Sequence, residues 1–288
     1  MRGDIISRGA KDRFTSGIRE DAMLAHELHG PEDGARVVLL GGIGMPRLVW
    51  HMTQLPALLA AGHRVALVDL RGSGDSPATE DRCAVSDLAA EVVEVLDGLG
   101  WERAAFVGVS LGGLVSEELA ATRPERVSAA VLIASAGPVT VYVRAWAEAI
   151  AGLLEANAGG LGRFFVAENL AYALPAKRLQ EDDAAVQGWV DLLTSLDWDS
   201  AGPRGQYRAW IAWSLAAAHP ARWPSIRVPV LVCSLEHDLL FPPAGGRKAA
   251  AAIPGARFAE IPGHAHNGVI EATPLLDPPI MEFLGSVL

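Results

Sequence analysis

The chain has 288 residues, of which 50% are hydrophobic, so it is long and apolar enough to bury a large core. Its formal net charge of -10 disfavours nucleic acid or an anionic membrane as a partner. With only Cys83 and Cys233, a disulfide framework is excluded and a reducing cytoplasm is the expected location. Residues 1–8 carry charges where a signal peptide needs an apolar stretch, and no run reaches the roughly 20 apolar residues of a membrane span.

Short apolar runs alternate with helix-like stretches through the first half of the chain. Residues 23–28 are a candidate antiparallel edge strand. The runs that predict further strands lie at residues 37–40, 65–68, 104–107 and 129–134. The stretches that predict helices lie at residues 50–60, 87–96 and 114–123. This alternation is typical of a mostly parallel sheet with helices on both faces.

One pentapeptide, Gly108-Val109-Ser110-Leu111-Gly112, stands between a predicted strand and a predicted helix. Glycines on both sides of Ser110 suit a sharp turn that places the hydroxyl group at the carboxyl edge of the sheet. A serine is a poor nucleophile unless a neutral imidazole takes its proton and a carboxylate holds that imidazole. The pattern therefore predicts a nucleophile at Ser110, with an ordinary helix N-cap serine as the alternative.

The pattern changes between residues 137 and 223, where alanine- and leucine-rich helical stretches are interrupted at Gly159-Gly160 and Gly202-Pro203. Aromatic side chains at high density usually build a core, and a few of them can also line an apolar substrate pocket. The segment contains six of the eight tryptophans, at positions 146, 189, 198, 210, 213 and 223.

Two later apolar runs end in loops that carry acids and histidines. The run at 228–233 precedes Glu236 and Asp238, and the run at 256–261 precedes His264 and His266. Serine, acid and histidine thus follow one another in the order expected for a nucleophile on such a turn. Because each group follows a predicted strand, all three are expected at one edge of the sheet. Spacing alone does not separate His264 from His266.

Several motifs together resemble the α/β-hydrolase family. Residues 39–44 (Leu-Leu-Gly-Gly-Ile-Gly) followed by Trp50 are similar to its oxyanion loop. Residues 69–76 (Asp-Leu-Arg-Gly-Ser-Gly-Asp-Ser) match its Asp-x-Arg-Gly-x-Gly-x-Ser turn. Residues 123–127 (Arg-Pro-Glu-Arg-Val) resemble the end of its nucleophile helix, and His266 with Glu271 resembles its terminal motif. The resemblance covers residues 20–137 and 224–288. The chain departs from the family at Gly41, where many relatives have histidine, and at Leu235, where they have a small residue.

The resemblance implies an α/β-hydrolase fold, a mostly parallel central sheet with helices on both faces and a helical cap inserted before the acid-bearing strand. Residues 1–136 and 224–288 would form the core, and residues 137–223 would form the cap.

The same resemblance selects residues for the site. It implies Asp238 rather than Glu236 as the acid and His266 rather than His264 as the base. The backbone N–H groups of Ile43 and Leu111 would form the oxyanion hole. Asp69 and Arg71 would brace the loop beside that hole and take no part in the chemistry.

The expected reaction is acyl transfer to water. Ser110 would attack the carbonyl of a fairly large, hydrophobic, uncharged acyl substrate, while His266 takes its proton and Asp238 holds the imidazole. Such hydrolysis of a carboxylic ester, thioester or lactone needs no cofactor. The alternatives on the same fold are a carbon-carbon bond hydrolase, a lyase or cyclase, and a non-enzymatic ligand receptor. Neither the substrate-binding residues nor the oligomeric state can be predicted from the sequence.

Other ligand chemistry finds weaker support in the sequence. His264-Ala265-His266 and His237-Asp238 offer possible metal ligands, but a His-x-His pattern is short and common, so no metal site is expected. Residues 41–44 (Gly-Gly-Ile-Gly) lack both the ending of a phosphate-binding loop and the spacing of a dinucleotide fingerprint.

Overall fold

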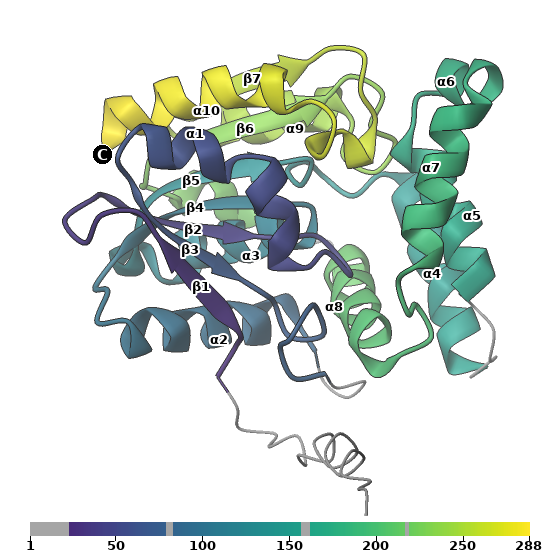
Figure 1. Cartoon of the computed structure of the whole chain (residues 1–288), viewed down its shortest axis with the longest axis horizontal. Helices are drawn as coiled ribbons and strands as arrows, with labels where there is room; N and C mark the ends of the chain where they lie inside the picture. The colour runs from purple at the N-terminus through teal and green to yellow at the C-terminus, as the bar shows by residue number, and fades with distance from the viewer. Residues whose placement is uncertain (1–22, 79–82, 157–161, 217–218) are drawn as a thin grey trace, which may run out of the picture.

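A seven-stranded sheet in the order β1-β3-β2-β4-β5-β6-β7 forms the centre of the molecule (Figure 1). The computed structural model describes residues 23–78, 83–156, 162–216 and 219–288. Strand β1 pairs antiparallel with β3 at the edge, and all other neighbours pair in parallel. The strands are β1 His26–His29, β2 Arg36–Leu40, β3 Arg64–Val68, β4 Ala104–Val109, β5 Val127–Ile133, β6 Val230–Leu235 and β7 Arg257–Ile261. The mostly parallel sheet predicted from the sequence is confirmed.

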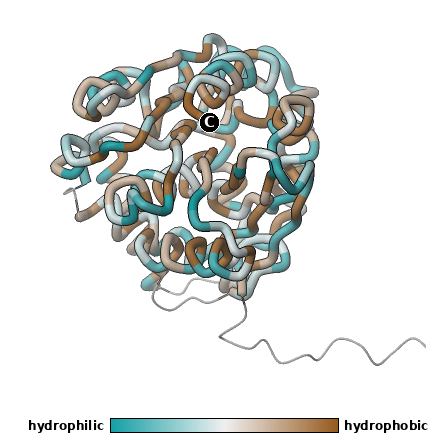
Figure 2. Tube along the Cα trace, turned by 90° about the vertical axis from the view of Figure 1, so that its left-hand side faces the viewer, coloured by the Kyte–Doolittle hydropathy of each residue, from teal (hydrophilic) through white to brown (hydrophobic). Residues whose placement is uncertain are grey.

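Helices cover both faces of this sheet, which is why its central strands are continuous apolar runs. All six residues of β4 are buried, and Val107 lies in register with Leu39 and Val131 on the two sides. Helices α2 (Val85–Gly98), α3 (Leu111–Thr122) and α9 (Pro243–Ala252) pack on one face. Helices α1 (Leu55–Ala60) and α10 (Thr273–Val287) pack on the other (Figure 1). Apolar and polar residues alternate along several helices, as amphipathic packing requires (Figure 2).

Five helices lie together at one end of the sheet, between β5 and β6 in the chain (Figure 1). They are α4 (Val141–Glu155), α5 (Gly162–Ala173), α6 (Ala176–Glu181), α7 (Asp183–Thr194) and α8 (Ala201–Ala216). The 3-10 helix η3 (His219–Ser225) leads the chain back to β6. This is the segment that the sequence assigns to the cap, and we call α4–α8 the cap helices.

The sequence prediction of one helix over residues 50–60 is wrong. A 3-10 helix, η1, covers Arg47–Met52, and α1 begins only at Leu55. Pro56 has no N–H to donate to the carbonyl of Met52, and its ring crowds that carbonyl, which favours the break between η1 and α1.

The sequence predicts that helices of the cap segment are interrupted at two glycine-containing positions. Gly202-Pro203 does not separate two helices but lies in the first turn of α8, where proline is tolerated because its N–H is not needed. Gly159-Gly160 lies outside the described residues, as do the charged residues 1–8 at the N-terminus.

Both cysteines are buried and free. Among the described residues, no helix is long and apolar enough to cross a membrane. The cytoplasmic location stays a prediction.

The turn between β4 and α3 is packed too closely for side chains at two of its glycines. A Cβ atom added to Gly108 would lie 2.2 Å from the carbonyl oxygen of Gly112, and one added to Gly112 would lie 2.2 Å from that of Leu40. Real Cβ atoms do not approach backbone oxygen so closely, so only glycine allows α3 to start against β2 and β4.

We expect Gly112→Ala to lower the free energy of unfolding by about 1–3 kcal/mol, because the new methyl group forces α3 away from β2. Urea denaturation followed by circular dichroism measures this change. Gly152→Ala is the matched control, since Gly152 lies exposed in α4 with no atom within 4 Å of an added Cβ. That variant should be neutral or stabilised by up to about 1 kcal/mol. Equal stability of Gly112→Ala and the unmodified protein would contradict the packing argument.

Candidate active site

Three side chains from three separate loops form a hydrogen-bonded chain at the carboxyl ends of parallel strands. Ser110 follows β4, Asp238 follows β6, and His266 follows β7. Nε2 of His266 lies 3.0 Å from the Ser110 Oγ, and its Nδ1 lies 2.9 Å from the Asp238 Oδ2. An ionised carboxylate can only accept, so Nδ1 carries the proton and Nε2 of a neutral ring accepts from the serine hydroxyl.

The Asp238 carboxylate is fixed from both sides. Its Oδ1 accepts hydrogen bonds from the backbone N–H groups of Leu240 at 2.8 Å and Phe241 at 2.9 Å. The other oxygen is thereby directed to His266, and both side chains are buried. The ring of His266 also packs edge-on against Tyr172 and parallel to Phe241. The imidazole is therefore held in one orientation.

Ser110 has a backbone conformation that side chains rarely adopt. Its φ is +50° and its ψ is -117°, although the residue is not glycine. Such strain costs about 1–3 kcal/mol and persists only where the surroundings impose it. Here the glycine contacts on both sides impose it, and the result is a hydroxyl that points out of the sheet towards His266.

The geometry separates the residues between which spacing could not decide. His264 turns its Nδ1 to the carbonyl oxygen of Pro262 at 2.8 Å and has no contact with the serine. Glu236 is exposed and accepts from the backbone N–H of Gly263 at 2.7 Å. His266, not His264, therefore bonds to Ser110, and Asp238, not Glu236, bonds to His266.

The loop after β2 places Ile43 beside the serine. A Cβ atom added to its neighbour Gly42 would lie 3.3 Å from the Ser110 Cβ, so the loop touches the serine. Leu111 is the first residue of α3. Within the described ranges, no hydrogen bond of the loops and turns takes the N–H of Ile43 or Leu111. Both groups are open to an acceptor, and their role as oxyanion donors stays a prediction.

Met45 lies against Gly41 in this loop. A Cβ atom at Gly41 would lie 2.8 Å from the Met45 carbonyl oxygen and 3.1 Å from its side chain. The methionine therefore occupies the space that a side chain at position 41 would need.

A buried glutamine of the cap holds this loop in place. The Oε1 of Gln206, on α8, accepts from the backbone N–H of Gly44 at 2.7 Å. Its Nε2 donates to the Arg71 carbonyl and to the Ser73 hydroxyl, each at 2.8 Å. One fully buried amide thus joins the cap to two loops of the core. Gln206 is not predicted from the sequence, because no local pattern distinguishes it from a surface glutamine.

The expectation that Asp69 and Arg71 brace the neighbouring turn agrees with their contacts. Asp69 is fully buried, accepts from the backbone N–H of Asp75 at 3.0 Å and pairs with Arg47. Arg71 pairs with Glu91 on α2. Neither residue bonds to Ser110, Asp238 or His266.

A cavity of about 170 Å³ lies between the cap helices and Ser110. Ser110 and His266 form part of its wall, together with mostly apolar side chains of the cap and core. Four of the six tryptophans singled out in the sequence line it, namely Trp146, Trp189, Trp198 and Trp210. Trp213 and Trp223 instead pack on His219.

One carboxyl group interrupts this apolar wall. Glu168, on α5, is 6% exposed, accepts from the Trp146 Nε1 at 2.6 Å and accepts from the Tyr207 hydroxyl at 2.9 Å. Burial raises its pKa to about 7, against the opposing effect of these two hydrogen bonds. Glu168 is not predicted from the sequence either, since a glutamate within a helix usually lies in solvent.

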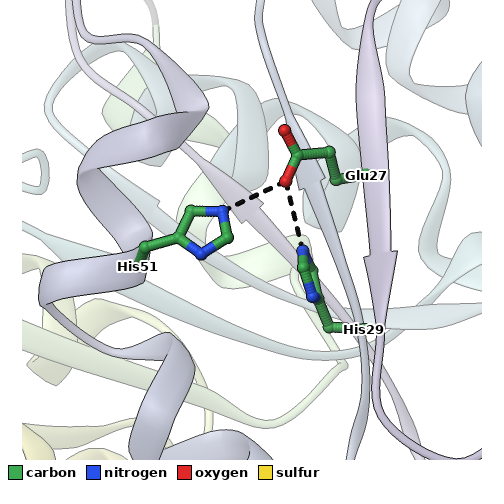
Figure 3. A group of neighbouring side chains, drawn as sticks. All are labelled: Glu27, His29 and His51. Atoms are coloured by element: carbon green, nitrogen blue, oxygen red, sulfur yellow. Dashed lines mark hydrogen bonds and ion pairs between the residues drawn. The ribbon is translucent and has the colours of Figure 1, made fainter.

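A second polar cluster lies outside this cavity, on the edge strand. His29 and His51 both bond to Oε2 of Glu27, at 3.2 and 3.1 Å (Figure 3). Their donor atoms all lie within 4.8 Å of one another, a spacing that metal ligands can have. The other oxygen of Glu27 accepts from Arg47 at 2.9 Å. These bonds join β1 to η1, directly after the loop that carries Ile43.

The fold and this constellation define the class of protein. The sequence matches the alpha/beta hydrolase fold family over residues 35–273, and the chain belongs to that family. Its mostly parallel sheet and the strand–turn–helix context of residues 108–112 agree with this class.

Particular relatives are similar over nearly the whole chain. "Putative carbamate hydrolase RutD" of Variovorax paradoxus is 33% identical, covering 92% of this chain and 97% of its own. The solved structure of "Putative non-heme bromoperoxidase BpoC" of Mycobacterium tuberculosis is 29% identical, with a TM-score of 0.82 over 92% and 96% of the two chains. The enol-lactonase of Burkholderia xenovorans is 27% identical, with a TM-score of 0.73 over 91% and 96%. The family and these names support an enzyme of the hydrolase class.

We expect Gln206→Ala to lower the free energy of unfolding by about 2 kcal/mol or more, because a fully buried amide and its three polar partners lose their bonds at once. Urea denaturation measures the loss. Gln187→Ala is the matched control, since Gln187 is an exposed glutamine whose amide bonds to Asp191 on the same helix. It should stay within about 0.5 kcal/mol of the unmodified protein. Similar effects of both substitutions would show that Gln206 does not hold the loops.

Proposed function

We propose that the chain is a serine hydrolase that cleaves a carboxylic ester or a related thioester or lactone. The observation that carries the proposal is the hydrogen-bonded chain from Ser110 through His266 to Asp238. This is the arrangement that activates a hydroxyl nucleophile at neutral pH. The membership of the alpha/beta hydrolase fold family supports it.

In the proposed reaction, the Ser110 Oγ attacks the substrate carbonyl as Nε2 of His266 takes its proton. Asp238 stabilises the imidazolium that forms, through the 2.9 Å contact with Nδ1. The imidazolium then protonates the leaving group, and an acyl group remains on the serine. A water molecule, deprotonated by His266, releases the acid and restores the enzyme.

The negative charge that develops on the carbonyl oxygen needs donors that are already in place. The N–H groups of Ile43 and Leu111 fit this role, since they adjoin Ser110 and have no competing acceptor among the described residues. Removing one such donor typically slows turnover by about 100- to 1,000-fold. Gln206 supports this function indirectly, because it bonds to Gly44, the residue after Ile43.

The cavity supports a substrate with a hydrophobic acyl part. It is bounded by aromatic and aliphatic side chains, and Ser110 and His266 lie in its wall. The names of the relatives differ in the bond cleaved, carbamate in one and enol-lactone in another, so the leaving group is best found by experiment.

Hydrolysis of p-nitrophenyl esters of increasing acyl length tests the proposal directly. The unmodified protein should release p-nitrophenol, and Ser110→Ala should lose roughly 10⁴-fold or more of the turnover, because the nucleophile is gone. Thermal unfolding checks that the variant is folded. If Ser110→Ala keeps the turnover of the unmodified protein, the serine is not the nucleophile. Absence of turnover with every ester, thioester and lactone offered would favour a receptor or a non-hydrolytic enzyme.

The two neighbouring histidines offer a matched pair for the base. We expect His266→Ala to lose roughly 10⁴-fold or more in kcat, because no other imidazole reaches the Ser110 hydroxyl in the described part of the chain. His264→Ala should stay within about 10-fold of the unmodified protein, since its ring bonds only to the Pro262 carbonyl. Steady-state kinetics with the best ester measures both variants. Equal losses would refute the assignment of His266.

A further inference from the structure

The cavity beside Ser110 contains an ionisable group that the proposed mechanism does not use. Glu168 lies in its wall and is 6% exposed, whereas Asp238 is already committed to His266. An unpaired carboxylate in an apolar cavity is costly, because it loses its hydration. A carboxyl group that ionises in such a place is therefore stabilised by a positively charged partner.

The residues around Glu168 supply hydrogen bonds to its carboxyl group. Trp146 donates to Oε1, while Tyr207 and, at 3.4 Å, Asn169 donate to Oε2. An ionised carboxylate has about four acceptor positions, so one remains without a protein donor. In the described part of the chain, Glu168 forms no ion pair with a lysine or arginine.

The surroundings of this open position suit a cation. The aromatic side chains of Trp146, Tyr172, Trp189 and Tyr207 line the same cavity, and two of them bond to the Glu168 carboxyl group. A carboxylate among aromatic rings is a favourable environment for an ammonium group, which binds both the negative charge and the ring faces.

We propose that Glu168 and these rings form an ammonium subsite, so that the substrate combines an apolar acyl part with a protonated amine. The inference rests on the proposed function, which makes the cavity the substrate site. It replaces the expectation of a wholly uncharged substrate: the amine binds at Glu168 while the carbonyl group reaches Ser110.

Several titratable groups from four elements act on Glu168. They are Tyr142 on α4, Tyr172 on α5, Tyr207 on α8 and His266 on the 3-10 helix η4 (His266–Val269). Burial raises the pKa of all three tyrosines, so they stay neutral at pH 6–8. Burial also raises the pKa of Glu168 to about 7. The carboxylate is therefore present above pH 7 and is lost as the pH falls through 7.

Binding of simple amines tests the subsite without any catalytic turnover. The probes are n-butyl-, n-hexyl- and n-octylammonium, each paired with the alcohol of the same length, and titration calorimetry measures their Kd for the unmodified protein. At pH 8 the ammonium of the best-fitting length should bind about 10-fold or more tightly than its alcohol. This preference should fall roughly 5- to 10-fold between pH 8 and pH 6, as Glu168 takes up a proton.

Glu117 provides a matched control for substitution of Glu168. It is also 6% exposed, accepts from a tryptophan Nε1 (Trp223, at 2.9 Å) and has a pKa raised to about 7 by burial, but it does not line the cavity. Glu168→Gln should remove the preference for ammonium over alcohol and most of its pH dependence. Glu117→Gln should leave both unchanged.

Three results would overturn the ammonium subsite. The first is alcohol binding as tight as ammonium binding at pH 8, which would show a neutral hydrogen-bond subsite. The second is an unchanged preference in Glu168→Gln, and the third is an equal loss in Glu117→Gln. If Glu168→Gln does not fold, the pH series with the unmodified protein decides. Because no probe is hydrolysed, failure of this inference is distinct from failure of the ester assays with Ser110→Ala.

Discussion

The backbone of α3 approaches β2 and β4 so closely that no side chain fits between them. Added Cβ atoms at Gly108 and Gly112 would lie 2.2 Å from carbonyl oxygens of the facing segments. The chain can pass from strand to helix in this space only if Ser110 takes a φ of +50°, which projects its hydroxyl group from the sheet edge. The position of the hydroxyl is thus a consequence of packing, and the loops after β6 and β7 need only bring their side chains to it.

The cap helices form hydrogen bonds to the segments on both sides of Ser110. On one side of the cavity, Gln206 joins α8 to the loop of Ile43 through the N–H of Gly44. On the other side, Trp189 of α7 donates to Glu271 at 2.9 Å, five residues after His266 in the chain. Both segments that flank Ser110 are therefore bonded to the cap helices, so a shift of these helices would disturb the loop of Ile43 and the segment after His266 together.

Two buried glutamates of this protein have different settings. Glu117 and Glu168 share their burial, a tryptophan donor and a pKa raised to about 7. Glu117 lies on the buried face of α3 and accepts from Trp223, whereas Glu168 lies in the wall of the cavity. The two carboxyl groups thus have similar burial and similar donors. They differ in their position in the fold, because a ligand in the cavity can reach Glu168 but not Glu117.

The sequence by itself determined the alternation of strands and helices, the mostly parallel sheet and the turn at Ser110, because these follow from local apolar periodicity and glycine placement. It also placed an acid and a histidine after the right strands. Spacing left His264 and His266 open, and the family resemblance favoured His266. The tertiary structure brings His266 to Ser110, and it alone revealed Gln206 and Glu168. Gln206 contacts Gly44 across 162 positions of the chain, and Glu168 meets Tyr207 across 39. Contacts over such separations depend on how the cap packs on the core, which no local pattern encodes.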